Sequence, residues 1–218
     1  MKPDVGEALR YLGIPHPPGE LRREAERMAD ELSDAIQPRY FYRVLPIKRL
    51  PDSVHLQGTG IALTGTTAFG MLAGCDRAVL LACTLGTRFD ALLLSAQARD
   101  MSKAVICDAL GSAFVEAGCD EAEQDISTRF PNLFLTDRFS PGYGDLPLSV
   151  QPDICAALDA PRRLGITVTP SLLMNPVKSV TAVIGLSGSP QPARIRGCEY
   201  CNLRETCQFR KEGKRCGA

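Results

Sequence analysis

The spacing of apolar residues along the chain predicts helices of different lengths. Apolar positions recur every three or four residues among charged ones over 21–36, which predicts an amphipathic helix that ends before Pro38. A longer run over 102–126 carries one apolar face and predicts a central helix packed on a sheet. Shorter helices are expected over 68–73, capped by the preceding threonines, and over 89–98 and 152–158.

Strands are predicted where apolar residues run continuously or alternate with polar ones. Such stretches occupy 42–47, 54–63, 78–83, 165–169 and 179–186, with proline, glycine or polar breaks between them. Strands and helices do not alternate regularly, which favours an α+β class over a doubly wound one. The expected fold is a single domain with a mainly antiparallel, curved sheet packed by helices.

Three parts are expected along the chain. Residues 1–37 form an N-terminal helical arm, 38–187 form the main domain, and 188–218 form a linker followed by a cysteine-rich tail. The linker is indicated by a cluster of small residues and prolines that suits neither helix nor strand, over 187–192.

Length and charge narrow the class of protein. At 218 residues the chain can bury a sizeable core, and its 25 basic and 25 acidic residues leave no general positive surface for nucleic acid or membrane. No apolar run approaches the ~20 residues that cross a bilayer, and the first residues are typical of neither a signal nor a transit peptide. We therefore expect a cytoplasmic protein with no nucleic-acid and no membrane partner.

The run Arg138-Phe139-Ser140-Pro141-Gly142-Tyr143 carries the clearest candidate binding chemistry. A guanidinium offers paired donors to a carboxylate or phosphate. Pro141 fixes one backbone angle, and Gly142 lacks the side chain that would keep a ligand away from the backbone. Tyr143 adds an aromatic wall with a polar tip. The pattern favours a loop that holds an anionic group, with an ordinary surface turn as the alternative.

Four cysteines in the C-terminal tail follow the spacing C-x2-C-x5-C-x8-C: Cys198, Cys201, Cys207 and Cys216. Four thiolates held by short loops can surround one tetrahedral zinc or a 4Fe-4S cluster, and either metal would stabilise a segment with so few apolar residues. The single C-x2-C pair favours iron-sulfur over zinc, and free or disulfide-bonded cysteines stay open. The remaining cysteines are expected to be buried small hydrophobes: Cys75, Cys83, Cys107, Cys119 and Cys155.

The Arg138 loop and two later blocks resemble the activation domain of cobalamin-dependent methionine synthase. The three blocks are 136–145, 165–171 and 174–180, and their order and spacing carry a likeness that extends over roughly 75–187. In that family the motif Arg-x-x-x-Gly-Tyr binds S-adenosylmethionine, and it falls here on Arg138, Gly142 and Tyr143.

The resemblance implies a role for each matching residue. Arg138 would bind the methionine carboxylate, and Tyr143 would line the methionyl and adenosyl groups. Gly142, which has no side chain, would let the ligand come close to the backbone. A glutamate of the corresponding helix touches S-adenosylmethionine in the family, and Glu116 matches it here, where it would hold the amino or ribose end. Glu116 stands at the edge of the apolar stripe of 102–126, beside small residues that favour a hollow, with a solvated glutamate as the alternative.

The same resemblance implies an activation subunit that acts in trans. The chain would bind S-adenosylmethionine and support the reductive methylation of cobalamin supplied by a methionine synthase or a related corrinoid protein. The chemistry of the tail, and not the resemblance, adds a hypothesis: a 4Fe-4S cluster there would relay an electron from a separate donor, which zinc cannot do. Two other classes stay open: a non-catalytic docking module with a zinc-stabilised tail, and an independent S-adenosylmethionine-dependent methyltransferase.

Overall fold

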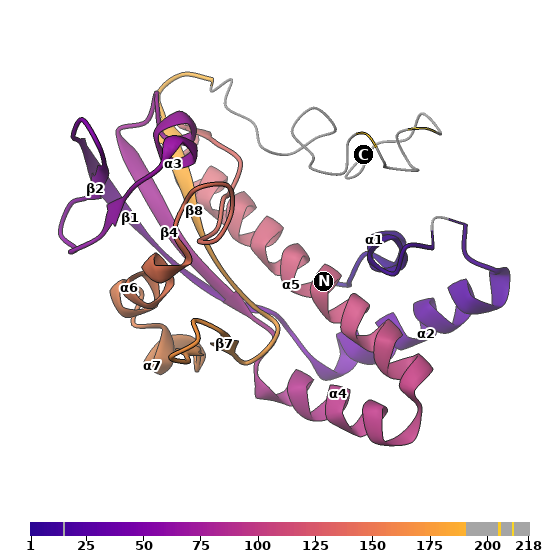
Figure 1. Cartoon of the computed structure of the whole chain (residues 1–218). Helices are drawn as coiled ribbons and strands as arrows, with labels where there is room; N and C mark the ends of the chain where they lie inside the picture. Colours follow the sequence, from indigo (N-terminus) through magenta and orange to yellow (C-terminus); the bar gives the residue numbers. More distant parts are fainter. Residues whose placement is uncertain (15, 191–204, 206–210, 212–218) are drawn as a thin grey trace.

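A six-stranded sheet forms the centre of the fold in the computed structural model, which describes residues 1–14, 16–190, 205 and 211 (Figure 1). The strand order is β3-β2-β1-β4-β8-β5, and each neighbouring pair is antiparallel. The strands are β1 (Arg39–Arg49), β2 (Val54–Leu56), β3 (Ala62–Leu63), β4 (Arg77–Thr84), β5 (Phe134–Leu135) and β8 (Ser179–Ser187). A separate antiparallel pair joins β6 (Thr167–Val168) and β7 (Met174–Asn175). The expected α+β class with an antiparallel sheet is confirmed.

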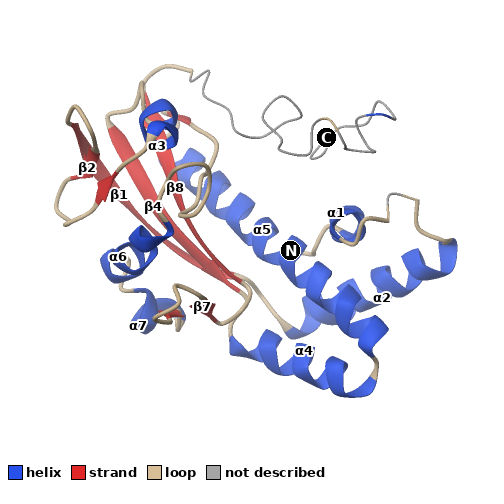
Figure 2. Ribbon diagram, in the orientation of Figure 1, coloured by secondary structure: helices blue, strands red, loops and turns tan. Residues whose placement is uncertain are grey.

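Helices cover both faces of this sheet (Figure 2). The long helix α5 (Met101–Arg129) lies across one face and packs there with α1 (Val5–Tyr11), α2 (Gly19–Ala35) and α4 (Thr87–Arg99). The other face carries α3 (Thr66–Met71), η1 (Leu148–Val150), α6 (Gln151–Ala157) and α7 (Ala160–Leu164). None of the described helices is long and apolar enough to cross a membrane.

The central strand β4 shows why two cores form. Its residues from Ala78 onward are all buried, as expected for a strand covered on both faces. Because side chains alternate along a strand, Val79 and Leu81 join the core under α5, whereas Leu80 joins the core under α6 and α7. Each core is thus lined by one side of the same continuous apolar run.

Most of the predicted elements are confirmed, with a difference at 54–63. The helices expected over 21–36 and 102–126 correspond to α2 and α5. The stretch 54–63 is a hairpin of β2 and β3 instead of one strand, because Gly58 adopts a positive φ of 80° in the turn between them. The short helix α7 was not predicted from the sequence.

Two glycines on α5 allow the helix to lie close to its neighbours. A Cβ added at Gly118 would lie 2.6 Å from Pro38 Cβ and 2.7 Å from Cys83 Sγ, so a side chain there would collide with the sheet. A Cβ at Gly111 would lie 2.2 Å from the ring of the fully buried Phe89. The close approach of α5 to the sheet therefore depends on Gly118, and its close approach to α4 depends on Gly111.

We expect Gly118→Ala to lower the free energy of unfolding by about 1–3 kcal/mol, because the added methyl overpacks a site bounded by a rigid proline. The matched control is Gly70→Ala in α3, where an added Cβ would meet nothing within 4 Å. That control is expected to raise stability by up to about 1 kcal/mol through helix propensity. Urea unfolding followed by circular dichroism measures both, and a Gly118→Ala protein as stable as the wild type would contradict the close contact.

Candidate functional site

The predicted binding loop is a compact turn between β5 and η1. The backbone N–H of Gly142 donates to Leu146 O at 2.9 Å, and that of Tyr143 donates to Ser140 O at 3.0 Å. Gly142 has a φ of 86°, a conformation that residues with a side chain rarely adopt. This positive φ is a structural reason for glycine at this position.

Asp145 fastens the end of this loop to helix α3. Its carboxylate accepts hydrogen bonds from Thr66 N at 2.6 Å, Thr66 Oγ1 at 2.7 Å and Thr67 N at 2.9 Å. The cap of α3 thus comes from a residue distant in sequence, and the expectation that the preceding threonines supply it was wrong. No local pattern could have indicated this cap, because Asp145 is 79 positions from Thr66 and 78 positions from Thr67.

Arg138 is buried and bound to α5. The residue is only 9% exposed, and its guanidinium donates to the carboxylates of Glu116, Asp120 and Glu123. The bond from Nη1 to Asp120 Oδ1 measures 2.6 Å. These acidic residues lie four and three positions apart, so they project from one face of α5.

The structure brings together two of the predicted site residues, Arg138 and Glu116, as partners of each other. Asp120 and Glu123 were missed from the sequence, although their helical spacing from Glu116 could have indicated them. Tyr143, in the turn of the same loop, is 38% exposed, whereas Arg138 is buried. The predicted residues thus form a buried charged end and an exposed aromatic end.

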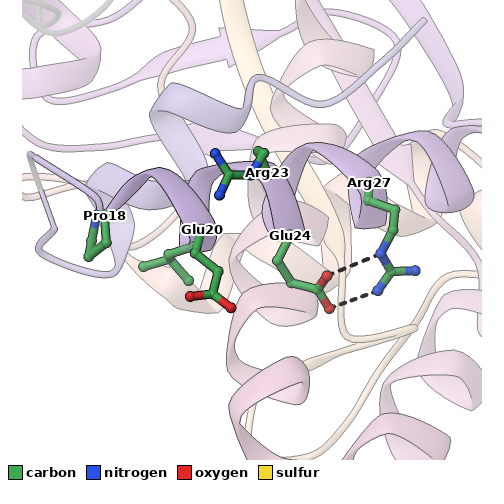
Figure 3. A pocket seen from close by; sticks show the side chains of 6 residues that line it. Pro18, Glu20, Arg23, Glu24 and Arg27 are labelled. Atoms are coloured by element: carbon green, nitrogen blue, oxygen red, sulfur yellow. Dashed lines mark hydrogen bonds and ion pairs between the residues drawn. The ribbon is translucent and has the colours of Figure 1, made fainter.

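Two hollows on the described surface lie away from this cluster. One, of about 710 Å³, runs along the start of α2, where Arg27 pairs with Glu24 (Figure 3). The other, of about 290 Å³, lies between β1, the β2–β3 turn and α6. Neither is lined by Arg138 or Tyr143, so the loop borders neither of these two hollows.

The outer edge of β8 is open beside the loop. Phe139 and Val183 exchange two backbone hydrogen bonds, so alternate residues of β8 direct their N–H and C=O away from β4. The next such residue is Thr181, and a continued pairing would put it opposite Pro141, which has no N–H to donate. Within the described part of the chain Thr181 has no backbone partner on this side, and its buried hydroxyl has no hydrogen bond either. Native proteins leave few such groups unpaired.

The cysteines of the folded part are buried thiols, as expected. Cys75, Cys83, Cys107, Cys119 and Cys155 are all free. Burial raises the pKa of Cys75 and of Cys155 to about 11, so both thiols stay protonated near neutral pH. Among residues 1–14 and 16–190, with 205 and 211, no three His, Cys, Asp or Glu side chains are arranged so that they could hold a metal ion. The predicted ligands Cys198, Cys201, Cys207 and Cys216 lie outside the described residues.

Comparison with known proteins finds a likeness in fold. The crystal structure of the MetH reactivation domain bound to AdoHcy matches with a TM-score of 0.66 and 19% sequence identity, over 92% of this chain and 74% of that chain. No protein-family model matches the sequence, and no curated protein matches it significantly. The chain therefore has a fold like that of the MetH reactivation domain, as the sequence resemblance implied.

We expect Asp145→Asn to lower the melting temperature at pH 7 and to make it less sensitive to acid. Hydrogen bonds from Thr67 and then from Thr66 hold the pKa of Asp145 well below its ordinary value. Because the folded-state pKa is the lower one, the stabilisation is present above the unfolded pKa of about 4 and is lost as pH falls below it.

Thermal melts of both proteins between pH 7 and pH 2 measure this effect. The difference between wild type and Asp145→Asn should shrink steadily below about pH 4. The exposed Asp153, in the first turn of α6, serves as a control, and Asp153→Asn should lower the melting temperature at pH 7 by less than Asp145→Asn does. A constant difference across the whole range would show that the Asp145 charge does not stabilise the loop.

Proposed function

We propose that the chain is an S-adenosylmethionine-binding activation subunit that supports the reductive methylation of cobalamin on a methionine synthase or another corrinoid protein in trans. The likeness in fold to a reactivation domain that was solved with AdoHcy is the main support. The motif residues Arg138, Gly142 and Tyr143 lie on one compact loop, and Glu116 contacts the first of them. The cytoplasm is the proposed location.

The charges around Arg138 suit the amino-acid end of this ligand. A zwitterion carries one carboxylate and one ammonium group, so it can insert between the guanidinium and a carboxylate of α5 while every charge keeps a partner. We propose that the ligand carboxylate takes donors of Arg138 and that its ammonium takes Glu116, whose side chain is 36% exposed. A simple anion would instead meet the repulsion of three carboxylates.

The rest of the ligand would extend along the loop and the edge of β8. Tyr143 offers an exposed aromatic face to the methionyl and adenosyl groups, and Gly142 leaves the backbone accessible. The unpaired groups of Thr181 favour a polar partner beside this loop. The ligand would thus lie between a charged end at Arg138 and an aromatic end at Tyr143.

Cobalamin on the partner would supply the chemistry, and this chain would supply position. Cob(II)alamin takes one electron from a reductant to become cob(I)alamin, whose electron pair forms a bond to the sulfonium methyl. The carbon–sulfur bond breaks, and methylcob(III)alamin and neutral S-adenosylhomocysteine result. The protein has only to hold the sulfonium methyl toward the corrin, which requires that the two ends of the ligand be fixed.

The cysteine tail is proposed as the route for that electron. Cys198, Cys201, Cys207 and Cys216 would hold a 4Fe-4S cluster, with zinc as the alternative. Several basic residues between them, including Arg204 and Lys211, would offset the negative charge of the thiolates. The partners implied are a corrinoid protein and an electron donor.

We expect calorimetry to detect binding of S-adenosylhomocysteine to the wild-type chain. Arg138→Ala should weaken it about 10- to 100-fold, because a charged hydrogen bond is lost, and Tyr143→Ala should weaken it about three- to tenfold. Arg129→Ala is the control, since Arg129 pairs with Asp125 elsewhere on α5 and should leave affinity unchanged. Circular dichroism checks that each variant is folded. If Arg138→Ala unfolds, Tyr143→Ala, at an exposed residue, still tests the site. No heat with the wild type would refute the proposal.

Anaerobically purified protein is expected to contain iron and acid-labile sulfide in equal amounts, and Cys207→Ser should lose both.

Methyl transfer is tested by mixing the wild type with S-adenosylmethionine, a one-electron reductant and a cobalamin-binding fragment in the Co(II) state. The mixture should produce methylcobalamin, which is detected by its visible absorption spectrum. A wild-type protein that contains zinc and no iron would remove the electron-relay role, while the methyl transfer itself would still be measured with the same reductant.

A further inference from the structure

The outer edge of β1 is open over much of its length. β2 pairs only with the end of this 11-residue strand, from Ile47 to Arg49. The backbone N–H of Gln57 donates to Pro46 O, so Pro46 and alternate residues before it direct their polar groups away from β4. Within the described chain the outward N–H and C=O groups of Tyr40, Tyr42 and Val44 have no hydrogen-bond partner. These three residues are partly exposed, so water can reach the edge.

A hollow adjoins this edge where β2 diverges from β1. Its volume is about 290 Å³, and it is lined by Arg43, by the β2–β3 turn from Gly58 to Ile61, and by α6 residues including Asp153. Small residues form much of its wall. A side chain of an added strand would therefore find a space next to the backbone that it pairs with.

Arginines line the α6 side of the edge. Arg39 donates to Leu164 O at 3.0 Å and Arg43 donates to Ala157 O at 2.6 Å, so the carbonyls that end α7 and α6 hold both guanidiniums along the strand. Each guanidinium has five N–H donors and uses one in these bonds. Arg163 lies on the same side, over the ring of Phe41 at 4.0 Å.

On the α6 side of this edge, acidic side chains are fewer than arginines. On the α6 side Asp153 lines the hollow, and Asp159 pairs with Arg162 at 2.6 Å. On the α5 side Asp125 accepts the Tyr42 hydroxyl and pairs with Arg129, and the exposed Glu121 is close enough to act on Tyr40. The charged side chains on the α6 side are therefore mostly arginines.

We propose that the edge of β1 from Tyr40 to Val44 is a docking site for an extended acidic segment of a partner protein. The segment would pair with the free backbone groups in line with β2, and its acidic side chains would face Arg39 and Arg43. One of these side chains would enter the 290 Å³ hollow. Backbone bonds would supply affinity and the arginines would supply selectivity.

A second copy of this chain fits the edge poorly. Antiparallel pairing of two β1 strands about a twofold axis at Tyr42 would gather the arginines of both copies on one face of the joined sheet, with Arg43 diagonal to Arg43 of the other copy. Like charges on neighbouring strands destabilise a sheet. The same arginines that attract an acidic strand therefore disfavour self-association.

The test uses a labelled eight-residue peptide of alternating glutamate and threonine with blocked ends, followed by fluorescence anisotropy on the whole chain. We expect saturable binding that weakens with salt, and none with the lysine–threonine peptide. Val44→Pro should weaken binding at least tenfold, because it removes the outward backbone N–H of residue 44 and leaves the hydrogen bonds to β4 in place. The strand already accepts a proline with the same outward orientation at Pro46. Arg43→Glu should have a similar effect, whereas Lys48→Glu, at a residue already paired with β2, should change affinity less than twofold.

Several outcomes would overturn the proposal. The first is that the glutamate peptide does not bind at about 1 mM. The second is that the same peptide binds equally well with all its amides N-methylated, a change that keeps the charge but removes the backbone donors. A wild-type dimer in light scattering that Val44→Pro converts to a monomer would assign the edge to a second copy. Thermal melts of each variant distinguish lost binding from lost folding, and Arg43→Glu keeps the test valid if Val44→Pro is unstable.

Discussion

The close packing of α5 on the sheet is the constraint on which the rest of the structure depends. Gly118 brings the helix backbone against Pro38 and Cys83, and Gly111 makes room for the ring of Phe89. Because the helix lies this close, the carboxylates on its flank can reach a loop at the sheet edge. The position of the candidate site is therefore a consequence of core packing, and a change in one glycine would move the site as well as destabilise the fold.

Arg138 is the point at which that packing becomes chemistry. A buried guanidinium needs partners, and α5 supplies three carboxylates from consecutive turns. The arrangement fixes the loop on one side, while Asp145 fixes it on the other through α3. The loop is thereby held at both ends, and the turn at Gly142 with the exposed Tyr143 lies between the two attachments. A rigid loop of this kind holds a ligand with little loss of entropy on binding.

The sheet ends differently on its two sides. At β8 the neighbouring loop pairs with Val183 and then leaves the strand at Pro141, next to the unpaired groups of Thr181. At β1 the short β2 covers only the end of the strand and leaves the remainder open beside arginines. The first edge adjoins the loop proposed to bind a small molecule, and the second is proposed to bind a protein segment. The two proposals concern opposite edges, so each can fail without the other.

The amino-acid sequence alone determined most of the element types, the α+β class, the buried cysteines and the loop motif, because apolar periodicity, turn residues and short spacings are local properties. It placed Arg138 and Glu116 in one site, and both residues do meet. Only the tertiary structure decided that they bind each other, that Asp145 caps α3, and that the stretch 54–63 is a hairpin which leaves β1 open. Each of these depends on which distant residues the core brings into contact, and that information is not present in any local pattern.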